Sequence, residues 1–199
     1  MKTLEGFEKK LENLIGKPTV LRPFVCDGSP LECDVFIVGL NPATGMKSGF
    51  WDFWRPGIGF DKRAWLDIYS QERMASLTSS GNKKASTSNT RKRINWIMEE
   101  ANSEGHCISF LETNIYAFPT KRKKDLKPEH KIIDVFEFLV SEINPKIILV
   151  HGNDANEILT RLRVGGCKII ESKHLYNCSE SISLEYGREI RNSLSKWCA

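Results

Sequence analysis

Residues 34–44, DVFIVGLNPAT, decide which fold this 199-residue chain can adopt. Residues 34–40 are apolar after Asp34 and rich in β-branched side chains, which predicts a short buried strand of a parallel sheet. A polar turn containing Asn41 and Pro42 follows directly. In open α/β sheets ligands gather outside the carboxyl ends of the strands, so this turn is the first place to expect a site.

Further strands and helices alternate along the rest of the chain. Three more short apolar runs predict strands at residues 109–117, 146–150 and 168–171. Apolar residues at helical spacing predict helices at residues 3–15, 90–101, 130–142, 153–163 and 185–197. This alternation favours one α/β domain spanning residues 1–199, a three-layer α/β/α sandwich with a central, mostly parallel four-stranded sheet.

The composition is that of an ordinary folded protein with a small excess of positive charge. The chain is 40% hydrophobic, and its 29 Lys and Arg against 25 Asp and Glu give a net charge of +4. This balance excludes an acidic protein and a polycationic tail, but it allows a nucleic-acid partner. The apolar runs are too short for a membrane span and charges interrupt the N-terminal residues, so we expect a cytoplasmic monomer.

Six cysteines are scattered through the chain without a CxxC pair. Without a secretion signal, this spacing favours reduced thiols over a disulfide framework. It also provides no close pair of ligands for zinc or an iron–sulfur cluster, so we expect neither a metal nor another cofactor.

Four polar segments leave the predicted strands at their carboxyl ends. In chain order they are GLNPAT (39–44), TNIYAFPT (113–120), HGNDA (151–155) and KHLYNCS (173–179). This series resembles the motifs of the uracil-DNA glycosylase superfamily, in the style of its mismatch-specific and single-strand-selective branches. GLNPA resembles the family's Gly-x-Asn-Pro-Gly turn, TNIYAFPT its base-reading strand, and KHLYNCS its late His-Pro-Ser motif.

The resemblance implies a reaction as well as a fold. The protein would flip a pyrimidine, uracil by default, out of DNA and hydrolyse its N-glycosidic bond to leave an abasic site. Asn41 would hold the attacking water, and His174 would donate a hydrogen bond to the departing base. Asp52, the carboxylate nearest the turn, is a second candidate for handling the water. Because no lysine is well placed in these motifs, we expect hydrolysis without lyase activity.

The same resemblance implies residues that hold the flipped base. Gly39 and Leu40 lie at the end of the first strand, and Phe50 would stack on the base, with the rings up to Trp54 as alternatives. Asn114 carries an amide donor and acceptor that match the edge of a pyrimidine.

Positive charge gathers in two segments that would bind DNA phosphates. The first is the Ser/Thr/Lys-rich loop at residues 78–93, with Lys83, Lys84 and Arg91. The second follows the Asn114 strand and contains Lys121, Arg122, Lys123 and Lys124. Leu175 and Tyr176 would fill the space left by the flipped nucleotide. His151 is interpreted as structural or phosphate-facing.

Two departures from the family's motifs leave the substrate open. Ala43 replaces the usual Gly, and Leu175 replaces the usual Pro. Together with the long segment before Arg93, they fit a glycosylase for a modified or hypermodified base, for instance in phage DNA, so DNA repair and antiviral defence both stay open. A non-catalytic nucleic-acid-binding module on the same fold is a second alternative, and a flavodoxin-like nucleotide-binding protein is a weaker one.

Overall fold

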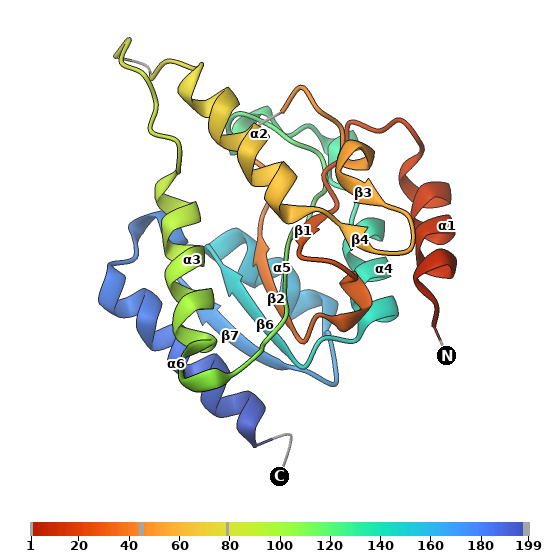
Figure 1. Cartoon of the computed structure of the whole chain (residues 1–199), viewed down its shortest axis with the longest axis vertical. Helices are drawn as coiled ribbons and strands as arrows, with labels where there is room; N and C mark the ends of the chain where they lie inside the picture. The colour runs from red at the N-terminus through yellow and green to blue at the C-terminus, as the bar shows by residue number, and fades with distance from the viewer. Residues whose placement is uncertain (1, 44–45, 79, 197–199) are drawn as a thin grey trace.

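Five strands form the main sheet of the computed structural model, which describes residues 2–43, 46–78 and 80–196 (Figure 1). In their order across the sheet they are β1 (Phe24–Cys26), β5 (Phe110–Asn114), β2 (Val35–Gly39), β6 (Ile147–His151) and β7 (Lys168–Ser172). The last four run parallel to one another. β1 pairs with β5 in the antiparallel direction at one edge.

The α/β class is thus confirmed, but the predicted four-stranded sheet is wrong: the sheet is mixed and contains β1 in addition. This strand has three residues and directly follows Pro23, so no alternating pattern marks it in the sequence. Its register places Phe24 opposite Thr113 and Cys26 opposite Leu111.

Helices cover both faces of the sheet and produce three layers (Figure 1). One face carries α1 (Leu4–Ile15), α4 (Asp134–Ile143) and α5 (Asn153–Leu162), and the other carries α3 (Asn89–Ala101) and α6 (Glu180–Ser195). The alternation of side chains along β2 supplies both cores, because Phe36 and Val38 belong to the first and Val35 and Ile37 to the second.

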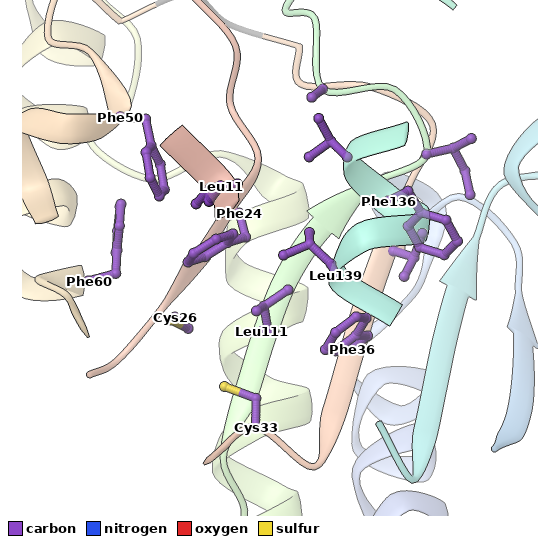
Figure 2. Close-up of a cluster of buried hydrophobic side chains, with 14 of the residues drawn as sticks. Leu11, Phe24, Cys26, Cys33, Phe36, Phe50, Phe60, Leu111, Phe136 and Leu139 are labelled. Carbon is purple, nitrogen blue, oxygen red and sulfur yellow. The ribbon is translucent and has the colours of Figure 1, made fainter. Parts of the chain in front are cut away.

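The first core is rich in aromatic side chains near β1 (Figure 2). The Phe24 ring lies 5.0 Å from the ring of Phe50, which stacks at 5.3 Å on Phe60. These contacts attach the segment that follows β2 to the edge of the sheet, where it forms part of the site described below.

Two helices differ in their bounds from the sequence-based expectation. α4 begins at Asp134 because Pro128–His130 form a separate 3-10 turn, η5. α6 begins at Glu180 because the Ser179 hydroxyl accepts a hydrogen bond from the backbone N–H of Ile182. Three positions from the predictions lie outside the described residues: Thr44 in the first turn, Ser79 in the basic loop and Trp197 at the end of the last helix.

Two elements lie where the sequence predicted none, α2 (Lys62–Met74) and the hairpin of β3 (Trp54–Arg55) and β4 (Gly59–Phe60). Asp61 caps α2 by accepting a hydrogen bond from the Ala64 N–H at 2.9 Å. The other short 3-10 helices are η1 (Pro30–Glu32), η2 (Phe50–Phe53), η3 (Ser103–Gly105), η4 (Lys123–Asp125) and η6 (Leu175–Asn177). Over the described residues, no helix is long and apolar enough to cross a membrane.

Candidate active site

The four parallel strands end along one edge of the sheet and bring the predicted motifs together there. Gly39 is in register with Asn114, and His151 is in register with Ser172. Because the strands are parallel, the segments that follow them leave the sheet on the same side. The site is built on this edge.

Two cavities adjoin at this edge. The first, which we call the aromatic cavity, has a volume of about 300 Å³ and includes Phe50, Trp65 and Tyr69 in its lining. The second, the basic cavity, has a volume of about 220 Å³ and includes Lys121, Arg122 and Lys123. Five residues line both cavities: Asn41, Ala43, Asn114, His151 and His174. Three of the residues proposed from the sequence for catalysis and base recognition therefore meet at one place.

Gly39 provides the room in which two of these side chains approach the end of β2. A Cβ atom at this position would lie 2.8 Å from Asn114 Oδ1 and 3.2 Å from both Cε1 and Nε2 of His151. Glycine is therefore required at position 39 for steric reasons, because the side chains of Asn114 and His151 approach it from the strands on either side. Leu40, which follows, is half-buried against the first core and lines the basic cavity.

The Asn41 amide is held in a defined orientation. Its Nδ2 donates hydrogen bonds to Thr120 Oγ1 at 2.8 Å and to the Pro42 carbonyl at 3.2 Å. Both bonds use the amide nitrogen, so Oδ1 is the atom that can accept a hydrogen bond from a water or a ligand.

His174 is exposed, and the backbone defines its tautomer. Its Nδ1 accepts a hydrogen bond from the Tyr176 N–H at 3.2 Å. A neutral imidazole with Nδ1 as acceptor carries its proton on Nε2. His174 therefore offers an N–H donor from Nε2.

His151 lies beside His174 but in a very different environment. The two rings meet edge to face, with centroids 5.1 Å apart and an angle of 75° between their planes. Burial, with a smaller contribution from His174, lowers the pKa of His151 to about 3, so this ring is neutral at ordinary pH. Within the described residues its Nδ1 is buried and has no hydrogen-bond partner.

A buried carboxylate lies below Asn114 on the same face of β5. Glu112 lines the aromatic cavity, is 3.0 Å from Lys62 Nζ of α2, and forms a second ion pair with Arg91 of α3. Burial alone would raise the pKa of Glu112, but Arg91 and Lys62 outweigh it, so the pKa lies below its usual value. The cluster connects both helices to the sheet and keeps this carboxylate ionised.

A ladder of rings and guanidinium groups forms one wall of the aromatic cavity. Trp65 and Tyr69 are one turn apart on α2 and stack with centroids 5.1 Å apart. Arg91 lies 5.1 Å from the Trp65 ring on one side, and Arg73 lies 5.6 Å from the Tyr69 ring on the other. All four residues line the cavity, so this wall combines aromatic surface with positive charge.

Some residues proposed from the sequence lie elsewhere. Asp52 lines neither cavity, and its Oδ2 accepts a hydrogen bond from the Gly49 N–H at 2.8 Å, so Asp52 is not among the residues that meet at the shared edge. Leu175 is fully buried in the second core, so it is not presented to DNA, whereas Tyr176 is 58% exposed. Phe50 lines the aromatic cavity but is 4% exposed, held between other rings of the first core.

The proposed phosphate-binding residues divide into two groups. Lys121, Arg122 and Lys123 line the basic cavity, where Lys123 forms an ion pair with Asp154, and Lys124 is exposed beside them. Lys83 and Lys84 line neither cavity. Arg91 lines the aromatic cavity, where it forms an ion pair with Glu112.

Sequence reasoning missed Glu112, Trp65, Tyr69 and the central position of His151. Two signals were present: an acidic residue within the apolar run FLETN, and aromatic residues spaced four apart before Arg73. Across the part of the chain described here, no three His, Cys, Asp or Glu side chains gather to hold a metal ion. No known protein-family model matches the chain, and no curated protein matches it.

Proposed function

We propose that this protein is a DNA glycosylase with the fold of the uracil-DNA glycosylase superfamily, which hydrolyses the N-glycosidic bond of a flipped pyrimidine. The observation that carries the proposal is the meeting of Asn41, Asn114 and His174 around one cavity edge. These residues come from three separate motifs, and each has a free chemical function that the reaction needs.

In the proposed reaction, the bond between C1′ and N1 of the base breaks, and its electron pair stays on N1. Negative charge spreads to O2 of the base, where the Nε2–H of His174 stabilises it by donating a hydrogen bond. Asn114 holds the polar edge of the base with its amide donor and acceptor. Water, positioned by Asn41 Oδ1, forms the new bond to C1′ and releases its proton to solvent.

The experiment uses a double-stranded oligonucleotide that contains one deoxyuridine, incubated with the protein and then treated with hot alkali. We expect strand breaks at that position, reduced about a hundredfold by Asn41→Ala and by His174→Ala, with DNA binding retained. The exposed Asn192→Ala and His106→Ala variants are the matched controls. Because hydrolysis leaves no covalent intermediate, borohydride should trap no protein–DNA adduct.

A second candidate function follows from the size of the aromatic cavity. Its volume is about 300 Å³, and its lining extends from Asn114 of β5 to Trp65, Tyr69 and Arg73 of α2. The space therefore extends beyond a bare pyrimidine ring, which favours a base that carries a substituent. Release of a modified pyrimidine from a substrate panel, with deoxyuridine left intact, would favour this candidate.

The non-catalytic alternative gives a different result in the same assay. A DNA-binding module would retain oligonucleotide binding while producing no alkali-sensitive site with any base in the panel. That outcome would exclude both glycosylase proposals.

A further inference from the structure

The aromatic cavity carries more positive charge than its acidic residues neutralise. Its lining contains the guanidinium groups of Arg22, Arg73 and Arg91 but the carboxylate of Glu112 alone. Glu112 is already occupied by Arg91 and Lys62. Two arginines at this cavity are therefore available to a negatively charged group.

Arg22 precedes β1 and is fixed by backbone contacts. Its Nη2 donates hydrogen bonds to the carbonyls of Met46 at 2.8 Å and Ser48 at 3.4 Å. Among the described residues, its Nε is buried without a hydrogen-bond partner. Burial lowers the pKa of Arg22, and the negative charge of Glu72 opposes this shift by a smaller amount. Arg22 Nη1 is not among the buried atoms and donates no hydrogen bond to the described residues, so it is the N–H group that an anionic oxygen in the cavity can reach.

Arg73 lies next to Glu72 at the end of α2. Its Nε donates to the Ala85 carbonyl at 3.1 Å, and the guanidinium group lies over the Tyr69 ring. Over the described ranges neither Arg22 nor Arg73 forms an ion pair. The neighbouring Glu72 carboxylate accepts a hydrogen bond from the Lys47 N–H.

The N-terminus of α3 adds to the same electrostatic field. Ser88, which caps this 13-residue helix, and Thr90 in its first turn both line the aromatic cavity. The first N–H groups of a helix carry partial positive charge, which favours an anion near them. The arginines and the N-terminus of α3 therefore both favour a negatively charged ligand in this cavity, which also has an aromatic wall.

We propose that the aromatic cavity binds an aromatic ring that carries an anionic oxygen group, with the anion held by Arg22 and Arg73 and the ring against the edges of Trp65 and Tyr69, whose faces cover each other and are covered by Arg91 and Arg73. The anion is either a carboxylate on the ring itself or the phosphate of a mononucleotide. This proposal concerns ligand binding and does not depend on cleavage of a glycosidic bond.

The test compares two anionic ligands with their neutral parents, by calorimetry on the full chain at low salt. Orotate, a uracil with a ring carboxylate, is compared with uracil, and uridine 5′-monophosphate is compared with uridine. We expect at least one anion to bind about tenfold more tightly than its parent. The pair that shows the preference tells whether the anion belongs on the ring or on the sugar.

Arg22→Gln and Arg73→Gln should each abolish this preference while uracil or uridine still binds, which also shows that the variant is folded. Arg55→Gln is the matched control, since this arginine lines neither cavity. Equal affinities within both ligand pairs would overturn the proposal, as would a preference that survives in both arginine variants. If inorganic phosphate bound as tightly as the preferred anion, this would overturn the claim that the aromatic ring of the ligand contributes to binding. Loss of deoxyuridine cleavage in the glycosylase assay would leave these results unaffected.

Discussion

The imidazole rings of His151 and His174 touch at the edge that the two cavities share, with their centroids 5.1 Å apart. One ring is buried and the other is exposed. A histidine that stays neutral thus contacts a histidine that solvent can reach. The contact lies where the proposed reaction needs an N–H donor.

Burial of His151 predicts a loss of stability in acid. Its pKa is about 3 in the folded protein, whereas the unfolded chain takes up this proton near the ordinary value of 6.5. Between these values the unfolded state binds more protons, so the free energy of unfolding falls as the pH decreases, by up to about 1.4 kcal/mol for each pH unit. We expect His151→Gln to flatten this dependence below pH 6.5, measured by urea unfolding at a series of pH values.

Exposed His106 supplies the control for that experiment. His106→Gln should keep the wild-type dependence of unfolding free energy on pH. A wild-type dependence in His151→Gln as well would show that this ring does not carry the effect.

Gly39→Ala should disturb the site more than the fold. The new methyl group would meet Asn114 Oδ1 at 2.8 Å, so Asn114 and His151 must move away from the end of β2. Such overpacking costs about 1–3 kcal/mol of stability, and under the proposed function we expect deoxyuridine cleavage to fall about tenfold or more. Thermal unfolding and the cleavage assay measure the two effects.

Gly165→Ala is the matched substitution, because a Cβ there would meet no atom within 4 Å. It should leave cleavage unchanged. Full activity in Gly39→Ala would contradict the positioning that we assign to Asn114 and His151.

Glu112→Gln should be strongly destabilising. The change removes the negative charge between Lys62 and Arg91 and leaves two cations without compensation beside the second core. Breaking a buried ion pair in this way typically costs about 3–5 kcal/mol. Urea unfolding at neutral pH measures the loss, and Glu157→Gln, which breaks an exposed pair with Arg161, should cost less than about 0.5 kcal/mol. Similar losses in the two variants would argue against the cluster as a structural anchor.

The positive charge in and beside the basic cavity leads us to expect that DNA binding weakens with increasing salt. If Lys121 and Lys124 contact phosphates, the double variant Lys121→Gln/Lys124→Gln should reduce the slope of log affinity against log salt by about 1.8. Filter binding at several salt concentrations gives this slope. The charge-matched variant Lys9→Gln/Lys196→Gln changes exposed lysines on α1 and directly after α6, outside residues 121–124, and should retain the wild-type slope. Equal slopes for the two double variants would place the DNA elsewhere.

The sequence predicted those features that depend on local pattern. β2 and β6 are largely apolar runs, and the polar residues after them mark the edge of the sheet where the candidate site lies. Asn41, Asn114 and His174 lie in or after predicted strands, and the resemblance of these segments to glycosylase motifs is what singles the three residues out in the sequence.

The remaining features depend on contacts between distant segments. Glu112 forms ion pairs with Lys62 of α2 and Arg91 of α3, and the local sequence around residue 112 does not predict these partners. Leu175 lies in a polar motif yet is buried, because η6 packs against α3 and the second core. Local sequence cannot separate a residue that enters DNA from one that enters the protein's own interior.

The pairing of the short strand β1 with β5 means that part of the candidate site is expected to form late during synthesis of the chain. β1 is secured by β5, and the Thr113 hydroxyl donates a hydrogen bond to the Pro23 carbonyl across 90 positions of sequence. Because β5 is the strand that β1 pairs with, we expect Arg22 and Phe24, which line the aromatic cavity, to take their places only after residues 110–114 have left the ribosome. A nascent chain halted before β5 lacks a wall of the pocket, so ligand binding should begin only when more than half of the protein has been synthesised.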